Sequence, residues 1–339
     1  MSRLLVTDIT LRDGNHAVAH QLTAEQLSAY AAAADAAGVP IVEVGHGNGI
    51  GASSLQVGEA LMTDAEMLAV VRKALKHARM SVHVIPGFAT IEKDLRPAVE
   101  AGVDVIRVAS HCTEADITER HITFARERGK EVYGVLMMSH MAPKEVLLEE
   151  ARKMEQYGAE GVVLMDSAGA YTPADVREKI GHLAEGLSVP VGFHAHNNLG
   201  LAVGNTLAAA ESGAYIVDGA AAGFGAGAGN AQLEAIVAVL EKYGYDTGID
   251  LYGVLDAADV CRAQLVETLP STTSTSIVSG LFGVFSAFLK PVNRAAEEYG
   301  VDPRDVFKEL GRRGIVAGQE DIIIEVARAL AGEGARHES

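Results

Sequence analysis

Short apolar runs rich in β-branched residues alternate with longer segments of helical periodicity through most of the chain. The pattern predicts eight strands, at residues 4–7, 41–44, 80–85, 103–109, 131–137, 161–165, 189–193 and 215–218. The helices expected after them cover residues 24–37, 64–77, 91–101, 114–128, 143–157, 173–185, 201–212 and 231–243. Eight such units in about 245 residues match the usual size of a closed (β/α)8 barrel.

Glycines mark the points where several of these helices should end. Gly38, Gly102, Gly129, Gly158 and Gly213 each stand shortly before an expected strand, as the C-cap residues of short αβ loops do. A doubly wound sheet is the competing architecture, but its glycine-rich dinucleotide fingerprint is missing after the first expected strand. We therefore predict an α/β protein with a (β/α)8 TIM barrel.

The alternation stops after Tyr243. Residues 251–262, 292–299, 303–312 and 319–331 have helical patterns, and no strands are expected between them. The Ser/Thr run at residues 271–276 is the most loop-like part of this region. We expect a barrel domain at residues 1–248 and a helical C-terminal domain at residues 249–339.

Composition narrows the class of protein and its partners. The 339 residues are 48% hydrophobic and 22% charged, as in an ordinary globular protein. Apolar runs end well before the ~20 residues of a membrane span, and the first residues lack the apolar block of a signal peptide. We therefore expect a cytoplasmic protein without a membrane partner. The formal charge of -17 argues against nucleic acid and leaves a small metabolite as the better partner.

Two histidines lie at the end of the seventh expected strand. His194 and His196 are two positions apart, so their side chains point to the same face of a strand and can meet one ion. Asp13, which follows the first strand, could supply a third ligand. One carboxylate and two imidazoles leave coordination positions open, which suits a catalytic Mn²⁺, Mg²⁺, Co²⁺ or Fe²⁺ better than a structural zinc site. The alternative is that both histidines only form hydrogen bonds in the barrel mouth.

Two ionisable side chains stand close to Asp13 in the sequence. Arg12 is permanently cationic and could neutralise charge on an enolate oxygen, or it could form an ion pair with Asp8 or Glu43. His16 can accept a proton near neutral pH, or it could be a surface histidine at the mouth of a loop. Because the chemistry of a barrel enzyme lies at the carboxyl ends of its strands, these residues predict an active site there.

These motifs resemble those of one group of enzymes. Arg12-Asp13-Gly14 and His194-Ala195-His196 are similar to the metal-dependent barrel superfamily of 3-hydroxy-3-methylglutaryl-CoA lyase and isopropylmalate synthase. Within this superfamily, a histidine at the position of His16 resembles the pattern of the 4-hydroxy-2-oxovalerate (4-hydroxy-2-oxopentanoate) aldolases. The acyl-CoA-using branches tend to carry glutamine one position earlier. Further segments that resemble the aldolases are residues 45–49, 111–116, 137–141, 166–169, 225–230 and 318–321.

The resemblance implies a divalent-metal-dependent class II aldolase that cleaves 4-hydroxy-2-oxo acids to pyruvate and a short aldehyde in aromatic hydrocarbon or steroid catabolism. The ion, usually Mn²⁺ with Mg²⁺ or Co²⁺ as substitutes, would be held by Asp13, His194 and His196. Arg12 would stabilise the pyruvate enolate, and His16 would take the proton from the C4 hydroxyl as the C3–C4 bond breaks. The implied substrate-binding residues are Arg12, Asp13, Ser167, His194 and Phe285.

One residue departs from the family pattern, and two other functions stay open. Phe285 stands where the family carries an active-site tyrosine, which bears on aldehyde preference and on stereochemical control at C4. The family also pairs with an acylating aldehyde dehydrogenase, for which the C-terminal helices would be the docking surface. The alternatives are an acyl-CoA-using lyase or condensing enzyme of the same superfamily, and a metal-binding scaffold subunit without full activity. Phe285 favours the scaffold, whereas intact Arg12, Asp13 and His16 oppose it.

Overall fold

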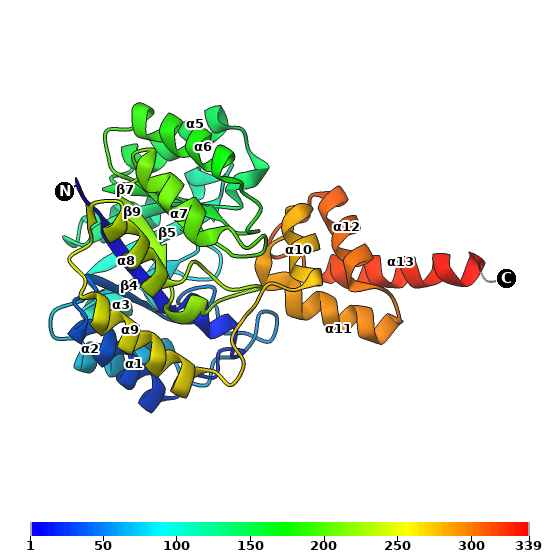
Figure 1. The fold of residues 1–339 in the computed structure, drawn as a ribbon, viewed down its shortest axis with the longest axis horizontal. Helices are drawn as coiled ribbons and strands as arrows, with labels where there is room; N and C mark the ends of the chain where they lie inside the picture. The colour runs from blue at the N-terminus through cyan, green and yellow to red at the C-terminus, as the bar shows by residue number, and fades with distance from the viewer. Residues whose placement is uncertain (1, 338–339) are drawn as a thin grey trace.

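Eight parallel strands close into a barrel in this computed structural model, which describes residues 2–337 (Figure 1). The strands follow one another around the barrel in sequence order, and the last pairs with the first. They are β2 (Leu5–Leu11), β3 (Ile41–Val44), β4 (Arg79–Val84), β5 (Val105–His111), β6 (Glu131–Met137), β7 (Gly161–Asp166), β8 (Val191–Ala195) and β9 (Ile216–Gly219). The eight predicted strands and the TIM barrel are confirmed, with strand ends displaced by a few residues.

Helices follow the barrel strands and cover the outside of the barrel. They are α1 (Ala24–Ala36), α2 (Asp64–Ala74), α3 (Arg96–Glu100), α4 (Glu119–Arg126), α5 (Lys144–Gln156), α6 (Pro173–Gly186), α7 (Ala202–Glu211) and α8 (Leu233–Lys242). Helices α3 and α4 are shorter than predicted because a π-helical turn, Ile91–Leu95, and a 3-10 turn, Ala115–Thr118, precede them. The five glycines predicted to end helices all have positive φ, from 67° at Gly129 to 106° at Gly158.

The interior of the barrel has an apolar layer and a charged layer. Because alternate residues of a strand face opposite sides, residues two apart share the interior. The apolar layer includes Ile41, Val105, Tyr133, Val163 and Ile216. Two positions further along three of these strands, Glu43, Arg107 and Asp218 face the same interior and are buried. The charged layer therefore lies nearer to the carboxyl ends of the strands, where the chemistry of a barrel is found.

The C-terminal helices form two structural groups. Helix α9 (Leu251–Val260) belongs to the same apolar cluster as the barrel and its helices, whereas the later helices surround a cluster of their own that contains Phe288, Phe307 and Val326. These later helices lie together beside the barrel, and α13 runs away from it (Figure 1). They are α10 (Ser274–Leu281), α11 (Leu289–Tyr299), α12 (Pro303–Arg313) and α13 (Asp321–His337). The division at residues 248 and 249 stays a prediction.

A small sheet ties the start of the chain to the end of the barrel. Strand β1 (Ser2–Arg3) pairs in parallel with β10 (Tyr245–Asp246). Within residues 2–337, none of the helices combines the length and the apolar character that crossing a membrane requires.

The prediction of a loop at residues 271–276 is wrong in its second half, where α10 begins. The side chain of Thr273 accepts a hydrogen bond from the backbone of Ser276, and the Ser276 hydroxyl accepts one from the backbone of Thr273. Hydroxyl residues favour loops and helix N-caps for the same reason, which is that they hydrogen-bond to nearby backbone groups. A Ser/Thr run is therefore ambiguous, and the apolar residues that follow it decide for a helix.

Candidate active site and metal centre

Three side chains from distant parts of the chain meet at the carboxyl end of the barrel. Asp13 begins a 3-10 turn after β2, His194 lies in β8, and His196 follows that strand. Their ligand-type atoms all lie within 4.8 Å of one another, and the Nε2 atoms of the two histidines are 3.4 Å apart. Two nitrogens bonded at ~2.1 Å to one ion stand about 3 Å apart, so this spacing suits a shared ion. The structure thus brings the predicted trio together.

The chemistry of these donors fits a divalent cation. Burial lowers the pKa of His196 to about 3, so its imidazole is neutral and able to ligate at pH 7. Burial opposes ionisation of Asp13, but the guanidinium of Arg12 and the neighbouring histidines together outweigh it and hold the pKa of Asp13 well below its usual value. The Nδ1 of His194 donates to Asp218 at 3.0 Å, which leaves Nε2 for a metal. One anionic and two neutral donors leave further coordination positions for a substrate.

Arg12 lies beside the trio with one nitrogen free. Its Nε donates to Glu43 at 2.5 Å, and its Nη1 donates to Asp13 at 2.6 Å and to the carbonyl of Gly47 at 3.2 Å. The predicted alternative of an ion pair with Glu43 is therefore present, but it does not use the whole guanidinium. Its Nη2 is buried and has no hydrogen-bond partner among residues 2–337. A buried N–H without a hydrogen-bond partner costs folding free energy, so this group is suited to donate a hydrogen bond to a ligand oxygen.

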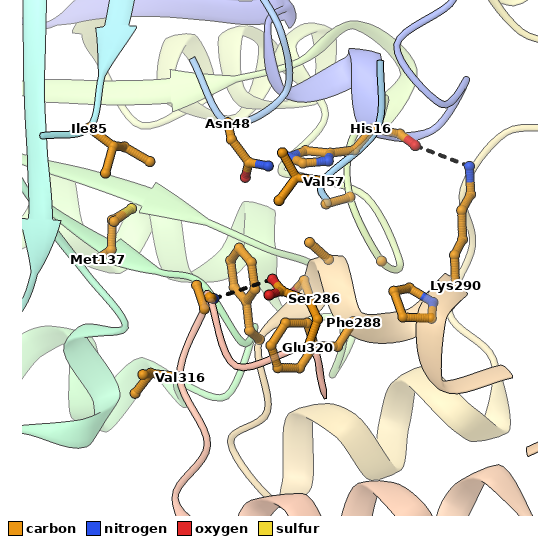
Figure 2. Close-up of a pocket in the computed structure, with 18 of the residues that line it drawn as sticks. His16, Asn48, Val57, Ile85, Met137, Ser286, Phe288, Lys290, Val316 and Glu320 are labelled. Carbon is orange, nitrogen blue, oxygen red and sulfur yellow. Dashed lines mark hydrogen bonds between the residues drawn. The ribbon is translucent and has the colours of Figure 1, made fainter. Parts of the chain in front are cut away.

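His16 ends the 3-10 turn that Asp13 begins, and its ring is packed against the loop after β3. A Cβ on Gly47 would lie only 2.5 Å from that ring, so glycine is needed there for the imidazole to fit. Burial lowers the pKa of His16 to about 4. The ring is therefore neutral at pH 7 and can accept a proton. Its backbone carbonyl accepts a hydrogen bond from Lys290 of α11 at 3.0 Å, so a C-terminal helix touches this segment (Figure 2).

A cavity of about 710 Å³ lies between the barrel mouth and the C-terminal helices (Figure 2). Its volume is typical of small-molecule sites. Its wall includes His16, Asn48, Ile85, Met137, Phe285 and Phe288. The cavity borders the trio through Ala226, which lines it and donates its backbone N–H to Asp13 at 3.1 Å. The three side chains of the trio do not line this cavity, so a ligand in it contacts His16 directly and is separated from the candidate metal centre by the wall that contains Ala226.

Of two further predicted residues, Phe285 lines this cavity, whereas Ser167 does not but is hydrogen-bonded to Met138 and Ser286, which do. Phe285 lies in the loop between α10 and α11, and its ring packs edge-on against Phe288 with centroids 5.5 Å apart. Ser167 lies at the end of β7, and its hydroxyl oxygen accepts the backbone N–H of Met138 at 2.9 Å. The carbonyl of Ser167 accepts the N–H of Ser286 at 2.9 Å, so Ser167 joins the barrel to the loop that carries Phe285.

Sequence reasoning did not single out several residues that shape this site. Arg107 and Asp218 are charged and buried inside the barrel, and Lys290 reaches the site from α11. A signal for the first two was present, because a charged residue inside an otherwise apolar strand pattern must have a partner when it is buried. No comparable signal marks Lys290, which lies in an ordinary amphipathic helix.

Comparison with known proteins agrees with this geometry. Residues 3–261 match the HMGL-like family and residues 270–332 match the DmpG-like communication domain. The 4-hydroxy-2-oxovalerate aldolase of Pectobacterium atrosepticum is 62% identical over 329 residues, which are 97% of this chain and 96% of that protein. The 4-hydroxy-2-oxovalerate aldolase of Spirochaeta aurantia is also 62% identical, over 98% of each chain.

A solved structure shares the fold at much lower identity. The carboxyl transferase domain from Rhizobium etli pyruvate carboxylase superposes with a TM-score of 0.80 at 18% identity and covers 98% of this chain. This chain spans only 60% of that one, and the likeness concerns the fold alone. The two family matches and the close relatives together cover nearly the whole sequence. The chain therefore belongs to the HMGL-like family of metal-dependent enzymes and, within it, to the 4-hydroxy-2-oxovalerate aldolases, which are carbon–carbon lyases.

Proposed function

We propose that this aldolase cleaves substrates of the 4-hydroxy-2-oxopentanoate type to pyruvate and a short aldehyde, with a divalent ion held by Asp13, His194 and His196. One observation carries the proposal. The Nη2 of Arg12, which is buried and has no hydrogen-bond partner within residues 2–337, lies in the same site as this trio, because Nη1 of Arg12 donates a hydrogen bond to Asp13. A fixed cationic N–H beside an ion site is suited to an oxygen on which negative charge develops during reaction.

Cleavage needs a base at one end of the substrate and an electron sink at the other. The ion, which we propose is Mn²⁺ with Mg²⁺ or Co²⁺ as substitutes, supplies Lewis acidity towards the 2-oxo acid when bound. The neutral imidazole of His16 takes the proton of the C4 hydroxyl, and C4 leaves as the aldehyde carbon. The electrons of the C3–C4 bond move into an enolate whose oxygen accepts a hydrogen bond from Arg12. The proton that His16 took from the C4 hydroxyl is then delivered to C3, which gives pyruvate and restores the neutral imidazole.

Ser167 and Phe285 complete the proposed substrate-binding set with Arg12, Asp13 and His194. Among the described residues, the hydroxyl proton of Ser167 has only a long contact of 3.5 Å, to the carbonyl of Met165, so it is available to a substrate oxygen. Phe285 shares the cavity wall with Ile85 and Met137, which surrounds the aldehyde end with apolar groups. A phenylalanine there offers no hydrogen bond to the C4 oxygen, so His16 is the proposed acceptor of its proton.

The partner and the cellular setting form the last part of the proposal. A match to the DmpG-like communication domain supports docking of an acylating aldehyde dehydrogenase on the C-terminal helices, which would receive the aldehyde. Ile277, Leu281 and Ile324 on these helices are exposed and apolar, as a docking surface requires. A cytoplasmic location and a role in aromatic hydrocarbon or steroid catabolism would fit pyruvate and an aldehyde as products.

The deciding experiment is pyruvate release from racemic 4-hydroxy-2-oxopentanoate and 4-hydroxy-2-oxohexanoate. Chelator-treated protein is assayed before and after addition of Mn²⁺, Mg²⁺ or Co²⁺. We expect release only after metal is restored, with the fastest turnover in Mn²⁺. The ratio of the two substrates ranks the aldehydes. Pyruvate release at an unchanged rate in chelated protein would contradict the metal-dependent mechanism, and no release from metal-loaded protein would favour the scaffold subunit instead.

A further inference from the structure

A fully buried arginine lies inside the barrel below the candidate metal centre. The side chain of Arg107, in the middle of β5, has no exposed surface. Its Nη1 donates to Glu43 of β3 at 3.2 Å and its Nη2 donates to Asp218 of β9 at 2.5 Å. Burial of a guanidinium is costly unless carboxylates pair with it, so these two contacts are needed for the arginine to remain there.

Each of these carboxylates makes a second bond that leads to the metal centre. Asp218 accepts the Nδ1–H of His194 at 3.0 Å with the same oxygen that accepts from Arg107. Glu43 accepts the Nε–H of Arg12 at 2.5 Å, and Arg12 donates in turn to Asp13 at 2.6 Å. An unbroken series of five hydrogen bonds therefore runs from one ligand candidate, His194, to another, Asp13, and Arg107 joins its two arms.

The charges along this series depend on Arg107. Burial opposes ionisation of Glu43, but Arg107 and then Arg12 outweigh it and lower the pKa of Glu43 to about 2. With Arg107 present, three carboxylates face two guanidinium groups, all of them buried. Without Arg107, the only guanidinium left among these five groups would be that of Arg12, for the three carboxylates of Asp13, Glu43 and Asp218. Their repulsion would move the carboxylates of Glu43 and Asp218 from the positions in which they accept from Arg12 and His194.

We propose that Arg107 is a positioning residue for the metal centre. Arg107 holds Asp218 against His194 and Glu43 against Arg12. Asp218 then keeps the Nδ1 proton of His194 on the side away from the ion and directs Nε2 towards His196, 3.4 Å away. Glu43 keeps Arg12 beside Asp13 with Nη2 free. The inference rests on the proposed metal site and adds a residue that touches neither the ion nor the substrate.

The test is the affinity of the full-length apo chain for Mn²⁺, measured as free Mn²⁺ by electron paramagnetic resonance. The variants are Arg107→Met, Arg107→Lys and Asp218→Asn, and circular dichroism checks that each is folded. Arg79→Met is the matched control, because Arg79 is also on a barrel strand and paired with a carboxylate, Glu131, but is partly exposed. Loss of an outer-shell partner typically weakens metal binding by about 10- to 100-fold.

We expect Arg107→Met and Asp218→Asn to fall within that range and Arg79→Met to bind like the wild type. Arg107→Lys keeps the charge but lacks the fork that reaches two carboxylates, so we expect a loss near the lower end, about tenfold. The Arg107→Lys variant still tests the inference if Arg107→Met fails to fold. Wild-type Mn²⁺ affinity in folded Arg107→Lys would overturn the inference about Arg107 and leave the metal site standing. Wild-type chain that takes up no Mn²⁺ would overturn the metal site and the inference together.

A second readout separates positioning from mere stability. At saturating Mn²⁺, Asp218→Asn affects the His194 side only, whereas Arg107→Met also loosens Glu43 and Arg12. We therefore expect the turnover number of Arg107→Met to fall further than that of Asp218→Asn under the same conditions. Equal turnover numbers for these two variants and the wild type would contradict a role of Arg107 towards Arg12.

Discussion

His16 is the side chain on which proton removal depends at the scale of single residues. It lines the cavity, and its imidazole is neutral at pH 7 because burial lowers its pKa to about 4. We predict that His16→Ala lowers the turnover number by about 10²- to 10⁴-fold, the usual contribution of a positioned base. Mn²⁺ content should stay unchanged, because His16 is outside the Asp13, His194 and His196 trio.

Turnover and bound metal are measured together for His16→Ala. His182→Ala is the control, since His182 lies on α6 on the outside of the barrel, away from the cavity. A His16→Ala variant with wild-type turnover would remove this residue from the mechanism. Loss of metal from the same variant would show that His16 holds the site together instead.

The acidity of His16 also predicts a pH dependence. A general base acts in its deprotonated form, so kcat/KM rises as the pH rises through the pKa of the base and is level above it. With a pKa of about 4, kcat/KM should change little between pH 8 and pH 5.5 at saturating Mn²⁺. A histidine at its ordinary pKa near 6.5 would lower it about tenfold over the same range. A pH–rate profile distinguishes the two, and a midpoint near 6.5 would contradict a partly buried base of lowered pKa.

At the scale of elements, the loop after β9 determines the position of Asp13. Gly225 lies in this loop, and a Cβ there would stand 2.0 Å from Nδ2 of Asn230 and 2.8 Å from Oδ1 of Asp13. Asn230 Nδ2 itself donates to Asp13 at 2.9 Å. We predict that Gly225→Ala displaces both side chains and weakens Mn²⁺ binding by about 10- to 100-fold, like other losses of outer-shell partners.

The Gly225→Ala prediction is checked by a metal titration with a second glycine as control. Gly181 lies within α6 with nothing within 4 Å of its ideal Cβ, so Gly181→Ala should leave Mn²⁺ affinity unchanged. It should also stabilise the helix by about 0.5–1 kcal/mol. Wild-type affinity in Gly225→Ala would mean that the loop can move away without disturbing Asp13.

The contact of α11 with the active-site turn is a second feature at this scale. Lys290 donates to the carbonyls of both His16 and Ala17, at 3.0 and 2.8 Å. The preceding loop is bonded to the barrel by the N–H of Ser286 and by the carbonyl of Gly283, which bonds to His140 at 2.8 Å. The C-terminal helices and the barrel mouth therefore meet at the backbone of the proposed base.

For the whole molecule, the metal should contribute to stability because its ligands come from opposite ends of the barrel sequence. Asp13 follows the first barrel strand and His194 lies in the seventh, so only the folded barrel presents them together. Free Mn²⁺ at 100 times its Kd should raise the free energy of unfolding by about 2.7 kcal/mol. Thermal unfolding with Mn²⁺ and with chelator measures this, and Asp13→Ala should show no such difference. Equal midpoints for the wild type in both conditions would contradict a native-state metal site.

The elements could be predicted from the sequence because their signals are local. Short apolar runs rich in β-branched residues and helical patterns, with glycines at helix ends, located all eight strands and the helices around them. Helix α10 was missed because the hydroxyl residues that cap it are also typical of loops. The positions of Asp13, His194 and His196 at strand ends were predictable for the same local reason, once the barrel was assumed.

What the sequence by itself determined is thus the barrel, the rim that carries the chemistry, and the residue types on it. Only the tertiary structure decided how those residues are bonded. Arg107 and Asp218 are 111 positions apart, and nothing local indicates that one will donate to the other. Closing the barrel sets which strands face one another across its interior, and the C-terminal helices close the cavity over His16. Contacts of this kind depend on the register of all eight strands at once, so the free Nη2 of Arg12 and the buried series through Arg107 appear only in the folded chain.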